Sequence, residues 1–135
     1  MVEQGDIDKY YKDATTITIY NPGDIEAHFR LKLYFNDFTN TQKIPAGSIS
    51  LPDGKTLSWS EISRKTDDTY IIFDSKLNLI CGAKGNYKTG TIYNEHISSG
   101  DFFTIPKGDS TLSISGAIPN AHKYRVNIEY DYYYL

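Results

Sequence analysis

Residues 100–116, GDFFTIPKGDSTLSISG, constrain the fold of this chain more than any other segment. Phe102, Phe103 and Ile105 form an apolar run that ends at a Pro-Lys-Gly-Asp turn. After the turn, Leu112 and Ile114 alternate with hydroxyl residues. Because successive side chains of a β-strand point to opposite faces, both apolar side chains lie on one face and the hydroxyls on the other. The segment is typical of two strands and their connecting turn in a β-sandwich.

Turn motifs and short apolar runs alternate along the rest of the chain. NPG, PDG, KTG, SSG and PKG recur at short intervals, and the 135 residues include 12 Tyr and 6 Phe. This pattern favours an all-β domain over a helical one. We expect an antiparallel two-sheet β-sandwich over residues 15–135. Residues 1–14 are expected to be an extended lead-in, the remnant of a longer chain.

Several strands are predicted individually. Alternating or continuous apolar residues predict strands at 15–20, 29–35, 70–73, 77–81 and 124–134, with a hairpin over 49–59. The run YIIF at 70–73 suits a central strand that is covered on both faces. Residues 82–99 are weakly patterned and are expected to be rich in loops. Cys81 follows an apolar run and is expected to be a buried, inert thiol.

Charge and hydropathy argue against several classes of protein. The net charge is −3 and the cationic residues are scattered, so no nucleic-acid surface is predicted. No apolar run approaches the length of about 20 residues that a membrane-spanning helix needs. The polar, acidic start MVEQGDIDKYYKD does not resemble a secretory signal.

Candidate catalytic and metal-binding residues do not form a known pattern. Asp67, Asp68 and Asp74 lie near turns, where carboxylates commonly accept hydrogen bonds from backbone N–H groups. The three histidines, His28, His96 and His122, lack the spacing of a zinc motif. The sequence therefore predicts no enzyme, no metal site and no cofactor.

Four segments occur in an order that resembles a known family. They are TIYNPGDIEAHFRLKLYF, YIIFD, SSGDFFTIPKGDSTLSISG and RVNIEYDYYYL. Together they resemble the C-terminal domain of siphophage distal tail proteins, a family of phage and prophage tail components. The motif positions, expected to be structural, are Asn21, Pro22, Gly23, Asp24, Asp74, Gly100, Phe102, Phe103, Pro106, Gly108 and Gly116.

The resemblance implies a fold, a location and a class of partner. It implies a jelly-roll sandwich similar to galectins and carbohydrate-binding modules, located at the tail tip of a virion assembled in the bacterial cytoplasm. Full-length members form hexameric rings through an N-terminal domain, and they dock the tail hub or receptor-binding proteins. Few residues precede Thr15, so this chain is similar to the C-terminal domain alone. Its own oligomeric state stays open, with a monomer as one alternative.

The sequence suggests four interface residues and leaves the kind of ligand open. Phe102 and Phe103 are adjacent, so one ring should point out of the core, where either a loop or a partner covers it. Tyr133 and Leu135 fall on the otherwise polar face of the last strand. Docking of another tail protein is the first hypothesis, and carbohydrate binding for host recognition is the alternative. Against the alternative, Trp59 lies in the predicted hairpin, where a packing role is expected.

Overall fold

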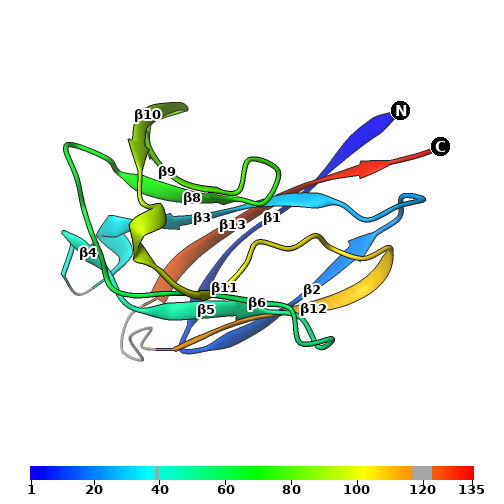
Figure 1. Ribbon diagram of the computed structural model, residues 1–135, viewed down its shortest axis with the longest axis horizontal. Helices are drawn as coiled ribbons and strands as arrows, with labels where there is room; N and C mark the ends of the chain where they lie inside the picture. Colours follow the sequence, from blue (N-terminus) through cyan, green and yellow to red (C-terminus); the bar gives the residue numbers. More distant parts are fainter. Residues whose placement is uncertain (39, 117–122) are drawn as a thin grey trace.

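The computed structural model describes residues 1–38, 40–116 and 123–135, and most of their regular structure is antiparallel β-sheet (Figure 1). One sheet has six strands, in the order β1 (Val2–Lys12), β13 (Lys123–Tyr133), β3 (His28–Tyr34), β8 (Tyr70–Asp74), β9 (Leu79–Lys84) and β10 (Tyr87–Ile92). The other has five, in the order β11 (Ile97–Gly100), β6 (Thr56–Trp59), β5 (Gly47–Ser50), β12 (Gly108–Gly116) and β2 (Thr15–Asn21).

Short elements connect the two sheets. β4 (Lys43–Ile44) and β7 (Ile62–Ser63) form a small antiparallel pair. Two 3-10 helices, η1 (Phe35–Asp37) and η2 (Asn94–His96), follow β3 and β10. In the part of the chain that the structure describes, none of the helices has the length and hydropathy of a membrane span.

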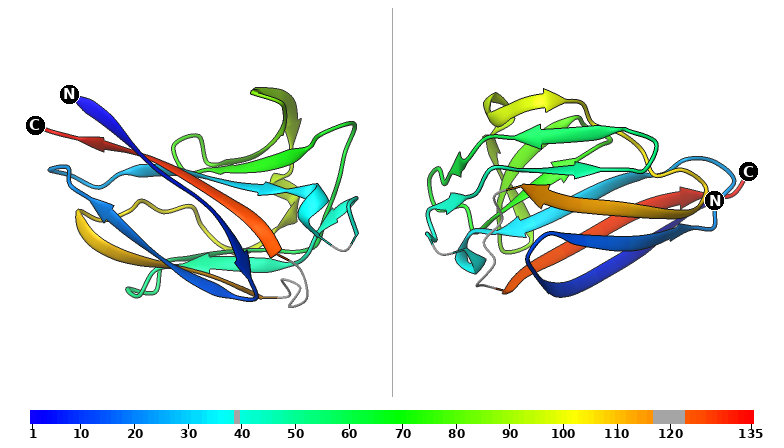
Figure 2. Two further views of the ribbon diagram at one scale, coloured as in Figure 1. Left: turned by 180° about the vertical axis from the view of Figure 1, so that it is seen from behind. Right: turned by 90° about the horizontal axis from the view of Figure 1, so that it is seen from below.

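The two sheets pack face to face, as the two views of Figure 2 show. Their inward side chains form one apolar core. Leu31 and Phe73 come from the six-stranded sheet, and Leu112 and Ile114 come from the five-stranded sheet; all four are fully buried. The rings of Trp59 and Phe73 lie 4.7 Å apart and join the sheets. The prediction of an antiparallel two-sheet sandwich is confirmed.

Strand alternation accounts for most of this core. In β3, Phe29, Leu31 and Leu33 are buried while the residues between them are half-buried. β8 is buried at every position, as its continuous apolar run predicted for a central strand. Cys81 is also buried, and burial raises the pKa of its thiol.

The region 82–99 differs from the prediction of a loop-rich segment. It holds the end of β9, the whole of β10 and of η2, and most of β11. β10 is an edge strand with mostly exposed side chains, so its sequence needs no apolar alternation. The alternation of apolar and polar residues that predicts a half-buried strand is therefore missing from β10.

The first residues are extended and belong to the six-stranded sheet. β1 pairs with β13 along its whole length, from Val2 opposite Tyr133 to Lys12 opposite Lys123. Only Ile7 and Tyr11 of this strand pack against the core. The segment expected to be an extended lead-in is thus extended, and residues 2–12 of it are an edge strand of the sheet.

Candidate functional site

Three motifs that are far apart in the sequence meet at one end of the sandwich. They are the turn Asn21–Asp24, the last part of the segment 100–108 and the end of β13. In Figure 1 the segment runs from the middle of the molecule, beside β6, to the end where the chain termini lie. Gly108 at the start of β12 pairs with Asn21 at the end of β2. The backbone N–H of Asp24 donates to the carbonyl of Tyr133 at 2.7 Å. This end contains most of the positions on which the family resemblance depends.

Asn21 connects the turn to the segment before β12. Its buried side chain accepts a hydrogen bond from the backbone of Gly23 at 2.9 Å. Its amide group donates to the carbonyls of Ile25 at 3.0 Å and Ile105 at 3.2 Å. Asn side chains commonly form hydrogen bonds with the backbone of their own turn. Asn21 can be buried here because both its side-chain oxygen and its side-chain nitrogen have hydrogen-bond partners.

Gly23 and Asp24 hold the end of β13. A Cβ atom on Gly23 would lie only 2.7 Å from the carbonyl oxygen of Tyr133, so a larger residue would push the strand away. The carboxylate of Asp24 accepts from the backbone N–H of Leu135 at 2.7 Å. Tyr133 is half-buried, whereas Leu135 is 91% exposed. The motif NPGD thus has a structural function at this end.

Gly100 sets the direction of the chain after β11. Its φ is +77°, a conformation that favours glycine, and an added Cβ would lie 2.1 Å from the carbonyl oxygen of Thr56. That carbonyl accepts from the N–H of Asp101 at 3.0 Å. The side chain of Asp101 then accepts from the N–H of Phe102 at 2.8 Å.

Phe102 and Phe103 do not point to opposite faces of a strand, which corrects the sequence analysis. The chain leaves the sheet after Gly100, and only Ile105 regains a ladder contact, a single bridge to Ala27. Phe103 is 7% exposed and its ring lies 5.3 Å from that of Phe29. Phe102 is partly buried against the same core. Both rings reach one core because strand alternation does not apply to this segment.

The two rings line a surface cavity of about 450 Å³. Glu26 of the β2–β3 loop, Lys55 and Thr56 at the start of β6, and Asp101 and Thr104 complete the lining. The cavity therefore combines an aromatic floor with carboxylates, an ammonium group and hydroxyls.

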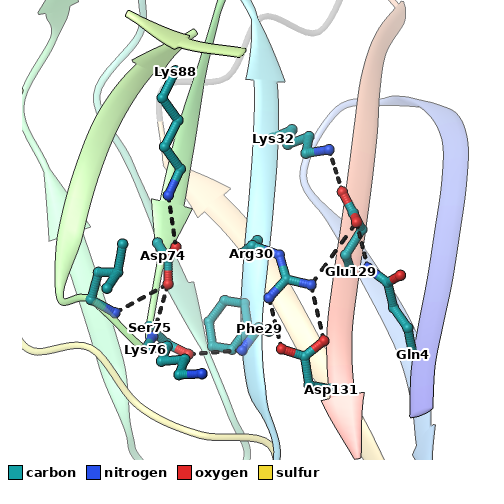
Figure 3. A network of polar contacts seen from close by, with 11 residues as sticks. Gln4, Phe29, Arg30, Lys32, Asp74, Ser75, Lys76, Lys88, Glu129 and Asp131 are labelled. Atoms are coloured by element: carbon teal, nitrogen blue, oxygen red, sulfur yellow. Dashed lines mark hydrogen bonds and ion pairs between the residues drawn. The ribbon is translucent and has the colours of Figure 1, made fainter. Parts of the chain in front are cut away.

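The remaining motif positions shape the backbone. Asp74 accepts hydrogen bonds from the backbone N–H groups of Lys76 at 3.0 Å and Leu77 at 3.1 Å, which confirms its expected role at a turn (Figure 3). Gly116 has φ +111°, and a Cβ there would lie 2.5 Å from the Cα of Gly47. Pro106 and Gly108 lie between the Ala27–Ile105 bridge and β12.

Ion pairs cover the outer face of the six-stranded sheet (Figure 3). Arg30 donates to both carboxylate oxygens of Asp131, at 2.9 and 3.1 Å. Glu129 lies 3.9 Å from Arg30 and pairs with Lys32. The hydrogen bonds from Arg30 hold the pKa of the Asp131 carboxyl below its ordinary value. The pairing fixes long side chains in a defined arrangement on this face.

Asp68 is a buried carboxylate, not the turn cap that the sequence suggested. It accepts from the hydroxyls of Tyr93 and Thr89, each at 2.5 Å, and it is fully buried. A Cβ on Gly82 would lie 2.1 Å from its carboxylate, so Gly82 makes room for it. Burial, with the hydrogen bond to Asp68, raises the pKa of Tyr93. The sequence carried no signal for this contact because Asp68 lies in the loop before β8, and its partners, in β10 and directly after it, are 21 and 25 residues away.

The histidines do not come together in the described residues. His28 lies in β3 and His96 in η2, while His122 is outside the described ranges. In residues 1–38, 40–116 and 123–135, no group of three or more His, Cys, Asp or Glu side chains could hold a metal ion. Trp59 is buried and donates its indole N–H to the carbonyl of Pro45 at 2.9 Å, which confirms a packing role.

Comparisons with known proteins add no family assignment. The chain matches no protein-family model, and searches of curated proteins and of solved structures return no significant match. The geometry of this end and the order of the motifs therefore carry the functional proposal.

Proposed function

We propose that this domain is a structural docking module of a phage or prophage tail tip, equivalent to the C-terminal domain of a distal tail protein. Its place would be in the virion, where it holds a tail-hub or receptor-binding protein. The proposal includes the jelly-roll, galectin-like arrangement and the hexameric full-length form that the resemblance implies. It assigns the domain no catalytic step.

The convergence of the motifs at one end is the observation that supports the proposal. NPGD, FFTIP and the tyrosine-rich terminus are each weak signals in sequence, yet their residues contact one another in space. Motifs that fold into one structure are more specific evidence of a family than separate turn signals. The antiparallel sandwich also agrees with the fold that the resemblance implies.

Rigid geometry would supply the docking mechanism. Two sheets that share one core deform little, so loops and strand edges at the motif end would be presented in a fixed arrangement. Phe102, Tyr133 and Leu135 stay candidate contact residues because they are at least partly accessible. Phe103 is buried and would act through the position of Phe102.

Coexpression with the tail proteins encoded beside the gene tests this proposal. We expect the protein to co-elute with the tail-hub or receptor-binding protein in size-exclusion chromatography, with defined stoichiometry by light scattering. Leu135→Asp should weaken the complex, because Leu135 is exposed and its loss does not disturb the core. Tyr87→Ala, at an exposed position in edge strand β10, is the matched control and should leave the complex intact.

Two results would overturn the proposal. One is the absence of tail genes around the gene for this chain. The other is failure to form a complex with any neighbouring tail protein when both partners are folded and soluble.

A further inference from the structure

Strand β2 is an edge strand of the five-stranded sheet and lacks the features that usually block an added strand. Its sequence is TTITIYN, without a charged residue, Gly or Pro. It pairs with β12 in an unbroken register from Thr15 to Asn21. An edge strand leaves one row of backbone N–H and C=O groups unpaired, and natural proteins protect such rows with charges, bulges or short length. By these criteria β2 is unprotected.

The other three edges of the two large sheets carry such protection. Strand β1 has five charged side chains, at Glu3, Asp6, Asp8, Lys9 and Lys12. In β10 the register shifts between Lys88 and Ile92. Strand β11 is only four residues long, and its register also shifts. An additional strand therefore meets the fewest obstacles at β2.

We propose that β2 binds an extended segment of a partner protein, whose side chains are alternately basic and apolar. Backbone hydrogen bonds to β2 would hold the segment, and its alternate side chains would point to the two faces of the sheet. The carbonyl of Tyr20 already accepts a hydrogen bond from the Tyr130 hydroxyl at 2.8 Å, so the segment would pair with residues 15–19. The inference goes beyond the docking function because it uses none of the contact residues proposed at the motif end.

The inner face of the added strand would lie over a gap between the edges of the two sheets. Strands β1 and β2 line a cavity of about 610 Å³ there. Ile7 and Tyr11 of its lining are only partly buried against the core. Both of its carboxylates are already engaged, Asp6 by Asn127 and Asp8 by Arg125. Apolar side chains of the segment would therefore pack on Ile7 and Tyr11.

The outer face beside β2 carries carboxylates instead. Thr18 of β2 lines a cavity of about 300 Å³ together with Asp109 of β12 and Asp53 of the β5–β6 turn, and the lining includes no cationic side chain. Asp109 forms no ion pair within the described part of the chain. Asp53 lies 3.9 Å from Lys55, and both side chains are about half exposed. A lysine or arginine of the segment could extend across Thr18 to these carboxylates.

Charge complementarity selects the occupant of this edge. Acidic side chains on the outer face of the added strand would be repelled by Asp53 and Asp109, whereas basic side chains would be attracted. A second copy of β2 would present only uncharged side chains on this face, at Thr16, Thr18 and Tyr20. It would leave the two carboxylates without a cation. A partner segment with basic residues therefore fits the edge better than a second copy of this chain.

Three synthetic peptides test the inference by two-dimensional amide NMR of the isotope-labelled protein. The first, acetyl-KVKVKVK-amide, has the proposed alternation, and the second, acetyl-EVEVEVE-amide, reverses its charge. The third, acetyl-KVKPKVK-amide, keeps every lysine but has a proline that interrupts strand pairing. We expect the first peptide to shift the amide signals of Thr16, Thr18 and Ile19 with a Kd below about 1 mM. The other two should bind at least about tenfold more weakly.

Two double variants locate the charge contribution. Asp53→Asn combined with Asp109→Asn should weaken binding of the first peptide by at least about threefold. The matched control is Glu61→Gln combined with Asp67→Asn, which removes two exposed carboxylates that line neither cavity. The control should bind the peptide normally. Since both double variants change the net charge equally, a difference between them reports the position of the carboxylates.

Three results would overturn the inference. One is the absence of shifts in the β2 amide signals at about 1 mM of the first peptide, and another is equal binding of all three peptides. The third is a concentration-dependent dimer in sedimentation velocity that Thr18→Lys abolishes, because a second copy would then occupy the edge. Leu135→Asp should leave peptide binding unchanged, so failure of this inference and failure of the docking proposal are distinguishable.

Discussion

The outer faces of the two sheets differ in chemistry although their inner faces share one core. On the six-stranded sheet, Arg30, Lys32, Glu129 and Asp131 form a connected set of ion pairs (Figure 3). On the five-stranded sheet, most outward positions of β2, β5, β6 and β12 carry short hydroxyl side chains instead, and the exceptions are Tyr20 and Asp109. The hydroxyl residues are Thr16, Thr18, Ser48, Ser50, Thr56, Ser58, Thr111, Ser113 and Ser115. The side chains on the inner face of each strand must be apolar to pack in the core, whereas those on the outer face are free to differ between the sheets.

The two outer faces also differ in how their side chains are held. Ser113 lies opposite both Thr16 and Ser50, and the hydroxyls of Ser48 and Ser115 lie 3.0 Å apart. Short hydroxyl side chains need no charged partner to stay solvated. Arg30 and Asp131, each 21% exposed, depend on one another because a partly buried charge is costly without its partner. Stability should therefore be sensitive to substitution on one outer face and tolerant on the other.

The largest expected effect tests whether the core is truly shared. Leu31→Ala in the six-stranded sheet and Leu112→Ala in the five-stranded sheet each remove a fully buried side chain. Each should lower the free energy of unfolding by about 3 kcal/mol, because a cavity adds to the lost burial. Urea denaturation measures both. If one variant costs less than about 1 kcal/mol, the sheets do not contribute equally to one core.

The next effect concerns the charged face. Arg30→Ala should cost about 2 kcal/mol of unfolding free energy, because Asp131 and Glu129 lose their shared cation while staying partly buried. The control is Lys43→Ala, which breaks an exposed pair with Glu61 and should cost less than about 0.5 kcal/mol. Equal costs for both variants would show that the network on this face adds nothing beyond ordinary surface pairs.

Lowering the pH should reduce the difference in unfolding free energy between the wild-type protein and Arg30→Ala. The pKa of Asp131 in the folded protein lies below its ordinary value, chiefly because Arg30 donates to it. The ion pair between Arg30 and Asp131 therefore stabilises the folded protein fully above about pH 4, and this contribution is lost as the pH falls through the lowered pKa of Asp131. Denaturation curves between about pH 6 and pH 2.5 should converge at the acid end. A constant gap across this range would contradict the assigned role of the ion pair.

The smallest effect is expected on the hydroxyl face. Thr16→Lys places a charge on an exposed position of edge strand β2 and should change the free energy of unfolding by less than about 0.5 kcal/mol. Glu129→Lys, the matched change on the charged face, should be much more destabilising because it puts a third cation beside Arg30 and Lys32. Thermal unfolding measures the stability of both variants. If Thr16→Lys and Glu129→Lys lower the unfolding temperature equally, the two outer faces do not differ in their tolerance of substitution.

The sequence alone predicted the strands that bury side chains on one face, such as β3 and β12, and the strand that is buried on both faces, β8. The alternation around Leu31 and Ile114 identified inward residues correctly, and the YIIF run identified a central strand. β1 and β10 could not be recognised in this way. No residue of either strand is fully buried, so their pairing depends on backbone hydrogen bonds, which leave little trace in the side-chain pattern. Edge strand β2, by contrast, buries Ile17 and Ile19 and was predicted from that alternation.

The site was less predictable than the fold. The sequence identified Phe102 and Phe103 as unusual, but the reason was wrong because the backbone leaves the sheet at Gly100. The cavity needs Glu26 and Lys55 from distant parts of the chain, and no local spacing indicates that they meet there. The contact of Asp68 with Tyr93 was missed for the same reason.

The pairing of β1 with β13 brings Met1 and Leu135 to the same corner of the molecule. The backbone of Met1 and that of Tyr134 exchange hydrogen bonds of 3.2 and 2.9 Å. A short linker could close the chain into a circle, and new ends could be cut at the exposed Gly85–Asn86 turn between β9 and β10. Such a circular permutant would retain every strand pair, so a cargo protein could be attached far from the motif end without disturbing it.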